Sequence, residues 1–278
     1  MHDTFKKFDL TGRTAFVTGG GTGIGYFMSR GLAALGARVM IAARRADVLA
    51  AAANQLREET GREVLYAPID LADRSNTIAA ARSAVERLGG VDIFVGNAGQ
   101  DSWAPIDRVR DEDVDRLMLV NVTANITLAR EFIPHMRKKK WGRILLSSSI
   151  TERLVSAQEG MTAYAASKAA VSSLARSIAV DTGHDGITAN AIVFGAFMTD
   201  MLQASLDSVG AEQRAHLVNA VVSQNALGRF AQPHEAEGVV QLLASDAGSY
   251  ITGAAIPVEA GWTVTLKANP AADPGDRP

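Results

Sequence analysis

Tyr164 and Lys168 lie one helical turn apart and are the pair in this chain best suited to acid/base chemistry. Side chains four residues apart share a helix face, so the ammonium group of Lys168 is expected beside the phenol of Tyr164. A nearby positive charge favours the phenolate and lowers a tyrosine pKa from its reference value of about 10. Three serines at 147–149 lie upstream. The pattern predicts a tyrosine that exchanges a proton with a substrate, but an ordinary surface helix has the same spacing.

A glycine-rich segment near the start of the chain is a second, independent signal. Residues 14–18 read TAFVT, a run typical of a buried parallel strand, and a helical pattern begins near Ile24. Between them, residues 19–25 read GGGTGIG, and glycine permits positive φ and close approach of the backbone to a ligand. The helix N-terminus offers free N–H groups to a phosphate. Strand, glycine turn and helix in this order predict a dinucleotide-binding fold.

The spacing of this turn, T-G-x-x-x-G-x-G, resembles the short-chain dehydrogenase/reductase family more than the ordinary G-x-G-x-x-G fingerprint. The resemblance extends from about Leu10 to Thr263, which is nearly the whole chain. It rests on separate motifs in sequence order: Thr18 to Gly25, Asp70-Leu71, Asn97-Ala98-Gly99, Asn121, Ser149, Tyr164 with Lys168, and Gly195 through Thr199.

The resemblance implies hydride transfer between a nicotinamide and a carbonyl or secondary alcohol carbon. Tyr164 would exchange the proton with the substrate oxygen, and Lys168 would lower the Tyr164 pKa and bind the nicotinamide ribose. Ser149 would stabilise charge on the substrate oxygen, with Ser148 as the alternative. The family's equivalent of Asn121 anchors a water that relays protons to the lysine.

The resemblance also implies where the cofactor lies. Asp70 and Leu71 would contact the adenine, the turn at 97–99 would run along the adenosine, and Thr199 would hold the nicotinamide carboxamide. The cofactor-binding residues predicted in this way, together with the two arginines considered next, are Gly19, Gly21, Thr22, Gly23, Ile24, Arg44, Arg45, Asp70, Leu71, Asn97, Ala98, Gly99, Tyr164, Lys168, Gly195, Phe197 and Thr199.

Two arginines after the second predicted strand point to the cofactor type. Residues 42–45 read AARR, and no acid occurs before Asp47. An acid at this place would accept hydrogen bonds from a ribose hydroxyl and repel a 2′-phosphate, whereas two guanidinium groups suit a phosphate. We therefore expect NADP(H), with NAD(H) as the alternative.

Composition excludes several classes of protein. The chain has 278 residues, a formal net charge of −2 and no long basic tract, which argues against nucleic acid as a partner. It has no cysteine, which excludes disulfides, thiolate catalysis and cysteine metal sites, and no metal is expected. The first ten residues lack the apolar core of a signal peptide, and no stretch of 18 apolar residues occurs. We expect a cytoplasmic protein with no membrane partner.

Strand-like runs alternate with helical patterns, which predicts an α/β fold: one Rossmann-type, doubly wound sheet of about seven parallel strands with helices on both faces. We expect one domain over residues 1–267 and a disordered tail over 268–278. The expected strands are 14–18, 38–43, 63–69, 91–95, 143–148, 187–193 and 254–258. The expected helices after the first are 47–60, 73–88, a long helix from 111 that is kinked at Pro134, and 162–181.

Three segments depart from the family pattern. Gly96 replaces the first asparagine of N-N-A-G, Phe194 replaces a proline before the late glycine, and Glu259-Ala260-Gly261 replaces D-G-G. None of them contains a proton-transfer residue, so catalysis is expected to be retained. A catalytically inactive NADP-binding sensor is the alternative function.

The sequence leaves the substrate open among a 3-oxoacyl thioester, a sugar or polyol, and a cyclic or steroid ketone. Residues 100–106, 150–162 and a helical lid at about 195–224 are expected to line the pocket. Glu152 and Arg153, like Gln158 and Glu159, are expected to be solvated, with contact to a polar substrate as the alternative. The family also implies a homo-oligomer, specifically a tetramer.

Overall fold

Seven strands form one parallel sheet in the computed structural model, which describes residues 3–154 and 160–265 of the chain. The strand order is β3-β2-β1-β4-β5-β6-β7, and every neighbouring pair is parallel. The chain moves outward from β1 in one direction and from β4 in the other, as in the predicted doubly wound fold. The strands are β1 Thr14–Thr18, β2 Arg38–Ala43, β3 Val64–Pro68, β4 Ile93–Gly96, β5 Gly142–Ser149, β6 Ile187–Phe194 and β7 Ala255–Val258.

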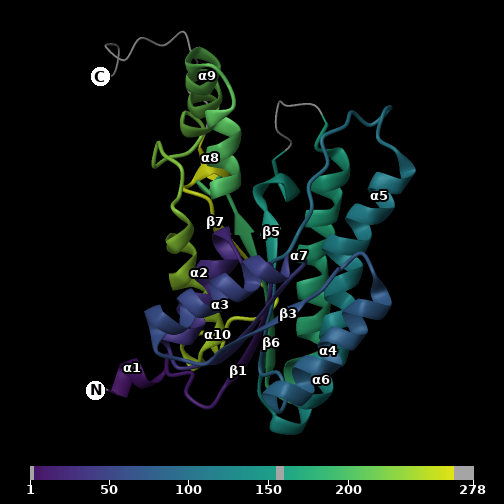
Figure 1. The fold of residues 1–278 in the computed structure, drawn as a ribbon, viewed down its shortest axis with the longest axis vertical. Coiled ribbons are helices and arrows are strands. Elements are labelled where there is room, and N and C mark those ends of the chain that lie inside the picture. Colours follow the sequence, from purple (N-terminus) through teal and green to yellow (C-terminus); the bar gives the residue numbers. More distant parts are fainter. Residues whose placement is uncertain (1–2, 155–159, 266–278) are drawn as a thin grey trace.

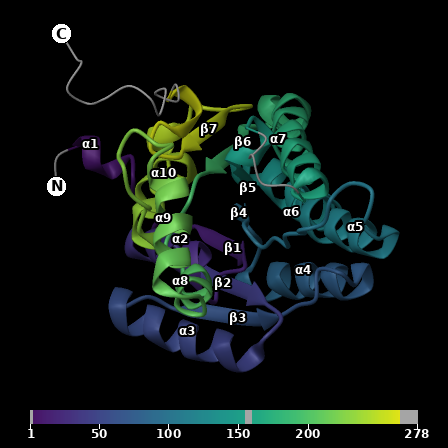
Figure 2. The same cartoon turned by 90° about the horizontal axis from the view of Figure 1, so that it is seen from above.

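Helices cover both faces of this sheet (Figures 1 and 2). One face carries α2 (Gly23–Ala34), α3 (Ala46–Thr60) and α10 (Glu237–Ala244). The other face carries α4 (Arg74–Leu88), α5 (Asp111–Met118), α6 (Ala124–Lys139) and α7 (Thr162–Thr182). The remaining helices are α1 (Asp3–Lys6), α8 (Asp200–Asp207) and α9 (Ala211–Val222), and α8 and α9 stand above the carboxyl ends of the strands in Figure 1.

Short helices of other types complete the described chain. A π-helix, η1, spans Leu119–Thr123 between α5 and α6. The 3₁₀ helices are η2 Ile150–Glu152, η3 Gly183–Asp185, η4 Pro233–Ala236, η5 Asp246–Gly248 and η6 Trp262–Val264.

Alternate side chains of the strands build two hydrophobic clusters, one on each face of the sheet. Val17 and Ile41 pack on the side of α2 and α10. Phe16 and Phe94 pack on the opposite side, where Phe132 of α6 meets their rings at centroid distances of 5.3 and 5.4 Å. Burying a side chain of this size contributes about 1.5–3 kcal/mol. The sheet is therefore fixed from both sides, and its carboxyl edge is a rigid base for the site.

The long helix after residue 111 is irregular at a different place from the one predicted. Pro134 lies inside α6, whereas the helix changes to π geometry at η1, around Asn121. The kink at Pro134 stays a prediction, and the π-helical irregularity at η1 was not predicted. Side-chain hydrogen bonds of two asparagines within and next to η1, described below, are the local reason.

Two predictions concern the ends of the chain and the membrane. The predicted disordered tail at 268–278 lies outside the described residues. Within residues 3–154 and 160–265, no helix is both long enough and apolar enough to cross a bilayer.

Candidate active site

The glycine turn after β1 and the turn after β4 are joined by one threonine at the edge of the sheet. The Oγ1 of Thr18 accepts hydrogen bonds from the backbone N–H groups of Asn97 and Ala98, each at 3.1 Å. β1 and β4 are neighbours, and the strand order reverses between them. Ligands of open α/β sheets bind outside the carboxyl ends of the strands at such a point. The two predicted cofactor motifs therefore lie together at the expected place.

Close packing explains the glycines of the first turn. Gly19 and Gly23 have φ of 69° and 55°, in the left-handed region that favours glycine. A Cβ at Gly25 would lie 2.2 Å from the carbonyl oxygen of Gly19, and a Cβ at Gly19 would lie 2.9 Å from Nδ2 of Asn97. Side chains at these positions would open the turn and displace the start of α2.

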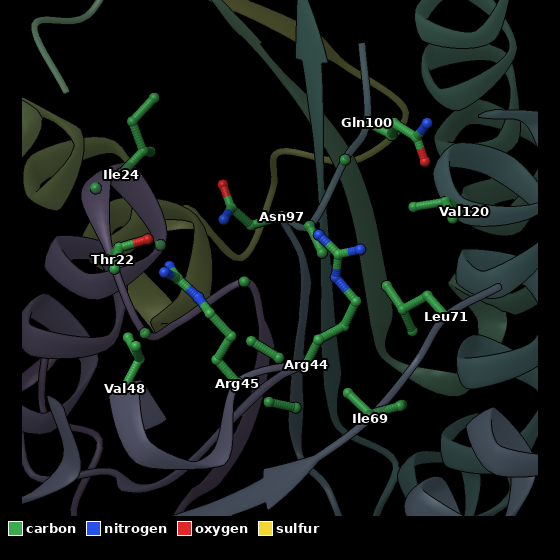
Figure 3. A pocket seen from close by; sticks show the side chains of 18 of the residues that line it. Thr22, Ile24, Arg44, Arg45, Val48, Ile69, Leu71, Asn97, Gln100 and Val120 are labelled. Carbon is green, nitrogen blue, oxygen red and sulfur yellow. The ribbon is translucent and has the colours of Figure 1, made fainter. Parts of the chain in front are cut away.

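A cavity of about 1060 Å³ lies over these turns. Every residue that the sequence predicted to bind the cofactor borders it except Tyr164, Lys168, Gly195 and Phe197. Figure 3 shows several of the lining side chains, from Thr22 and Ile24 on one side to Leu71 and Val120 on the other. Gln100, Asp101 and Asp200, from segments expected to line the substrate pocket, also border the cavity. The lining residues that the predicted site did not include are Gly25, Ala42, Ala43, Val48, Ile69, Arg116 and Val120.

Arg44 and Arg45 reach into this cavity from the end of β2. Figure 3 shows Arg45 extending toward Thr22 and Arg44 toward the middle of the cavity. Both residues are exposed, and no acid among the described residues lies within 4.0 Å of either guanidinium group. Two unpaired guanidinium groups at one cavity wall form a site for a phosphate.

Phe197 differs from the expectation that its side chain faces a ligand in the main cavity. Its ring is 5% exposed and packs edge-on against Phe194, with centroids 5.3 Å apart. It belongs to the core cluster on the α2 side and borders a separate, smaller cavity of about 170 Å³. Burial of the ring is the physical reason, and Phe194, in place of the usual proline, supplies its partner.

The three serines at the end of β5 have different partners. Ser149 forms a hydrogen bond with the hydroxyl of Tyr164. The Oγ of Ser148 instead lies 2.6 Å from Oε2 of Glu152 and 2.9 Å from the carbonyl oxygen of Lys168. Successive side chains of a strand point to opposite faces, so only one of these two neighbours can face the tyrosine. The structure brings together Ser149 and Tyr164, and not the alternative Ser148.

Lys168 is buried on the same helix as Tyr164. It is 5% exposed, and its Nζ donates to the carbonyl oxygen of Ser147 at 3.0 Å and lies 5.5 Å from the centroid of the Tyr164 ring. Burial without a paired carboxylate lowers the pKa of Lys168 to about 8. A Cβ at Gly99 would lie 3.2 Å from this Nζ. Because Gly99 borders the large cavity, the amine lies immediately behind the cavity wall.

The pKa of Tyr164 is raised above its ordinary value, which corrects the expectation of a lowered one. Burial of the phenol is the largest cause, the hydrogen bond from Ser149 acts in the opposite direction, and the negative charge of Asp101 raises the pKa further. The expected effect of Lys168 is not among these causes. Its ammonium group lies over the ring and donates to the carbonyl oxygen of Ser147.

Asn121 connects the turn after β4 with α7. Its side chain exchanges two hydrogen bonds with the backbone of Gln100, at 2.8 and 2.9 Å, and its Nδ2 also donates to Oγ of Ser167 at 3.0 Å. Ser167 precedes Lys168 in the chain. The asparagine is 1% exposed, and every one of these contacts orients residues at the site. Its predicted role in anchoring a water stays a prediction.

Asn125 is a residue that the sequence analysis missed. Its Nδ2 donates to the carbonyl oxygen of Asn121 at 2.7 Å, within the π-helical turn. Its Oδ1 lies where a side chain at Gly96 would begin, 2.1 Å from the position of a Cβ. The four-residue spacing of the two asparagines was the available signal.

Glu152 was expected to be solvated, and its carboxylate is instead buried. Its side chain is 6% exposed, and Oε2 accepts hydrogen bonds from Ser148 and from Ser172 of α7. Arg153 pairs with the other oxygen at 3.2 Å. The carboxylate is buried because both of its oxygens have donors, and it fastens η2, which follows Ser149, to the helix that carries Tyr164.

The segments predicted to line a substrate pocket are partly described. The backbone N–H of Ala104 donates to the carbonyl oxygen of Gly160 at 2.9 Å, so segments 100–106 and 160–162 meet. Thr199 caps α8 by accepting from the N–H of Leu202 at 3.3 Å and lies against Gly23. Gln158 and Glu159 lie outside the described residues.

Comparison with known proteins places this geometry in a family. The family model for short chain dehydrogenases matches residues 13–209. A 3-oxoacyl-[acyl-carrier-protein] reductase, FabG, of Rickettsia felis is 34% identical over 253 residues, which cover 91% of this chain and 98% of the relative.

Solved structures agree with this result. The crystal structure of a gluconate 5-dehydrogenase from Burkholderia cenocepacia in complex with NADP and tartrate has a TM-score of 0.86 and 31% identity, and covers 95% of this chain and 100% of that one. A 3-oxoacyl (acyl-carrier-protein) reductase from Agrobacterium tumefaciens with NADP bound has a TM-score of 0.86 and 29% identity, with coverage of 93% and 97%. The chain therefore belongs to the short-chain dehydrogenase/reductase family, whose enzymes oxidise CH–OH groups or reduce C=O groups.

Proposed function

We propose that the protein transfers a hydride between NADP(H) and a carbonyl or secondary alcohol carbon, with Tyr164 as the residue that gives or takes the proton. The observation that carries this proposal is the hydrogen bond between Ser149 and the Tyr164 hydroxyl, which joins the end of β5 to α7. A phenol and an aliphatic hydroxyl in contact can both reach one substrate oxygen.

The cofactor supplies or accepts the hydride at the substrate carbon when it is bound. In reduction, the O–H bond of Tyr164 breaks, and its proton goes to the former carbonyl oxygen. Ser149 donates a hydrogen bond to the same oxygen while its charge develops. A phenol whose pKa is raised by burial is protonated at neutral pH, which is the state that reduction needs.

Lys168 and Asn121 prepare the site in different ways. The amine of Lys168 lies behind Gly99 and can reach a ribose hydroxyl on the other side of this glycine, which has no side chain to block it. Asn121 holds the backbone of Gln100 and the side chain of Ser167, so it acts as a positioning residue.

NADP(H) is supported over NAD(H) by Arg44 and Arg45. Both border the cavity next to the glycine turn, where an adenosine ribose would lie, and neither is paired with an acid of the described chain. The related dehydrogenase and the related reductase solved with NADP support the same choice. Binding of the cofactor by the glycine turn at 19–23, by residues 97–99 and by Thr199 belongs to this proposal.

A homo-oligomer, specifically a tetramer, is also part of the proposal. The exposed faces of α6 and α7 carry isolated apolar side chains, Ile126 at 45% and Val180 at 80% exposure. Light scattering at micromolar protein concentration tests this part, and a monomer would contradict it.

The test of the function is oxidation of NADPH in the presence of three carbonyl classes: 3-oxoacyl thioesters, keto-sugars and cyclic ketones. We expect turnover with at least one class and a lower KM for NADPH than for NADH. The inactive sensor would instead be favoured if the protein bound NADPH but neither reduced any of the carbonyl compounds nor oxidised any of the matching alcohols.

A further inference from the structure

The segment after β4 holds an acid and an exposed indole next to the proposed proton donor. The Oδ2 of Asp101 accepts a hydrogen bond from Nε1 of Trp103 at 3.1 Å, and the Trp103 side chain is 58% exposed. This pair is not a loose surface contact, because the chain on both sides of it is fixed. Gln100 is bound by Asn121 through two hydrogen bonds, and Ala104 is bound by Gly160.

The segment of Asp101 is tied to the helix that carries the reacting hydroxyl, because Asn121 binds Gln100 and also donates to Ser167 of α7 at 3.0 Å. Asp101 borders the large cavity together with Gly99 and Gln100, and its negative charge disfavours ionisation of Tyr164. Arg116 of α5 and Asp200 of α8 also border the cavity, but neither is among the groups that act on the tyrosine. A substrate bound to the Tyr164 hydroxyl therefore meets the field of a carboxylate.

We propose that Asp101, with Trp103 beside it, makes this site select uncharged or cationic carbonyl compounds over those that carry a carboxylate near the carbonyl group. The inference rests on the proposed function, because it assumes that the substrate oxygen binds at Tyr164 and Ser149. It goes beyond that function by naming a charge class for the substrate.

Two physical effects give this preference its sign. Two negative charges a few ångströms apart repel each other, and because Asp101 is exposed the repulsion has the strength of a charge pair at a protein surface. The face of an exposed indole attracts apolar or cationic groups, not anions. An uncharged substrate avoids the repulsion and keeps the contact with Trp103, so the pair favours the uncharged form of any given substrate.

The test compares three cyclohexanones that differ only in one ring substituent: a carboxamide, a carboxylate and an aminomethyl group. We expect the wild-type enzyme to reduce the carboxamide and aminomethyl ketones with a kcat/KM at least about tenfold above that of the carboxylate, the size of effect expected for a charge pair a few ångströms apart. Asp101→Asn keeps an oxygen for the Trp103 hydrogen bond and removes the charge. It should raise the ratio of kcat/KM for the carboxylate to kcat/KM for the carboxamide about five- to tenfold, whatever the change common to both ketones.

A binding measurement accompanies the kinetics. Calorimetric titration of the NADP⁺-saturated enzyme with the three corresponding cyclohexanols should show the weakest binding for the carboxylate, as in the kinetics. Asp101→Asn should reduce the difference in dissociation constant between the carboxylate and the carboxamide. Asp107→Asn is the matched control, since Asp107 lies in the same loop with its side chain 73% exposed and contacts Arg108. The control should leave the ranking as it is in the wild type.

The outcomes separate the two proposals. Equal affinities of the wild type for carboxamide and carboxylate, or a ranking that Asp101→Asn does not change, would overturn the role of Asp101. Absence of turnover for all three ketones, with the calorimetric ranking still present, would count against the proposed function and leave the charge preference in place.

Discussion

The carboxamide of Asn125 occupies the space that a side chain on residue 96 would need. Its Oδ1 would lie 2.1 Å from a Cβ at Gly96, and its Nδ2 donates to the carbonyl oxygen of Asn121 at 2.7 Å. In the sequence, Gly96 stood out as a missing asparagine of the N-N-A-G pattern. The structure shows that a different asparagine, from α6, fills this place and at the same time satisfies a carbonyl of the π-helix.

This pairing predicts that substitutions at the two positions are not independent. Gly96→Ala should destabilise the protein by about 1–3 kcal/mol, because the new methyl group overlaps the Asn125 carboxamide. Asn125→Ala should cost about 1–3 kcal/mol, because it removes this buried hydrogen bond to the Asn121 carbonyl and leaves a small cavity. The double variant should lose less free energy of unfolding than the two single variants together, by at least about 1 kcal/mol. Urea unfolding of the four proteins measures the difference.

Gly238→Ala is the matched control for this cycle. Gly238 lies in α10, and an added Cβ would have no atom within 4 Å. This substitution should stabilise the protein by about 0.5–1 kcal/mol, the ordinary difference between glycine and alanine in a helix. Additive costs for Gly96→Ala and Asn125→Ala would show that the two residues do not share one space.

The roles of the neighbouring serines predict different pH profiles. Ser149→Ala removes the hydrogen bond that lowers the Tyr164 pKa, so this pKa should rise further. Alcohol oxidation needs the phenolate and therefore increases with pH. Its midpoint should move to higher pH in Ser149→Ala, and kcat should fall about 10²–10³-fold through loss of the donor to the substrate oxygen.

Ser148→Ala is the comparison variant. Its hydroxyl contacts Glu152 and the backbone of Lys168, away from the phenol. The pH midpoint of kcat/KM should stay that of the wild type, with at most a loss of stability. A shift in Ser148→Ala that equals the shift in Ser149→Ala would contradict the assignment.

Much of this arrangement follows from the sequence, because strands and glycine turns are local features. The apolar runs predicted the strands to within about two residues. T-G-x-x-x-G-x-G located the cavity correctly, through the positive φ of Gly19 and the close backbone contacts at Gly19 and Gly25. Contacts between distant segments were less accessible. Burial of Glu152 depends on Ser172 of α7, and burial of the Phe197 ring depends on a core cluster that includes Ala236 and Val240.

The pKa of Tyr164 shows the same limit at the site itself. The spacing of Tyr164 and Lys168 correctly predicted that they share one helix and lie near each other. The spacing could not predict how deeply the phenol of Tyr164 is buried, or that the charge of Asp101, from the loop after β4, acts on it. The direction of a pKa shift depends on desolvation and on all nearby charges together.

Burial of Lys168 predicts a specific dependence of stability on pH. The pKa is about 8 in the folded state and 10.5 as the reference value, so between these values the unfolded chain binds a proton that the folded chain lacks. Stability should therefore rise with pH across this window, and below pH 8 the buried charge costs the full amount, about 3 kcal/mol.

Replacement of this lysine tests that cost. Lys168→Met should be more stable than the wild type by about 1–3 kcal/mol at pH 7, although the hydrogen bond to Ser147 is lost. The rise in stability that Lys168 causes between pH 8 and 10.5 should be absent from this variant. Its activity should be lost. Lys138→Met, at an exposed position on α6, should change neither property. Urea unfolding at several pH values decides, and a less stable Lys168→Met at pH 7 would be the contrary result.

The arginines at the end of β2 predict a change in cofactor preference. Replacing Arg44 and Arg45 by alanine should weaken NADPH binding by at least about tenfold, since a hydrogen bond to a charged group contributes about 1.5–3 kcal/mol. The affinity for NADH should change little, because it has no 2′-phosphate. Fluorescence titration with both nucleotides measures the ratio of their dissociation constants. The control is Arg62→Ala, which replaces an exposed arginine between α3 and β3. Equal weakening for both nucleotides would place the phosphate elsewhere.

The central claim is that the hydroxyl of Tyr164 transfers the proton, and Tyr164→Phe tests it most directly because it removes only that oxygen. The measurement is kcat for reduction of the best ketone substrate, together with the dissociation constant of NADPH for the same variant. The account predicts that kcat falls at least about 10²-fold, as for loss of a general acid, while NADPH binding changes less than about threefold. A variant that binds NADPH normally and keeps the wild-type kcat would contradict the account.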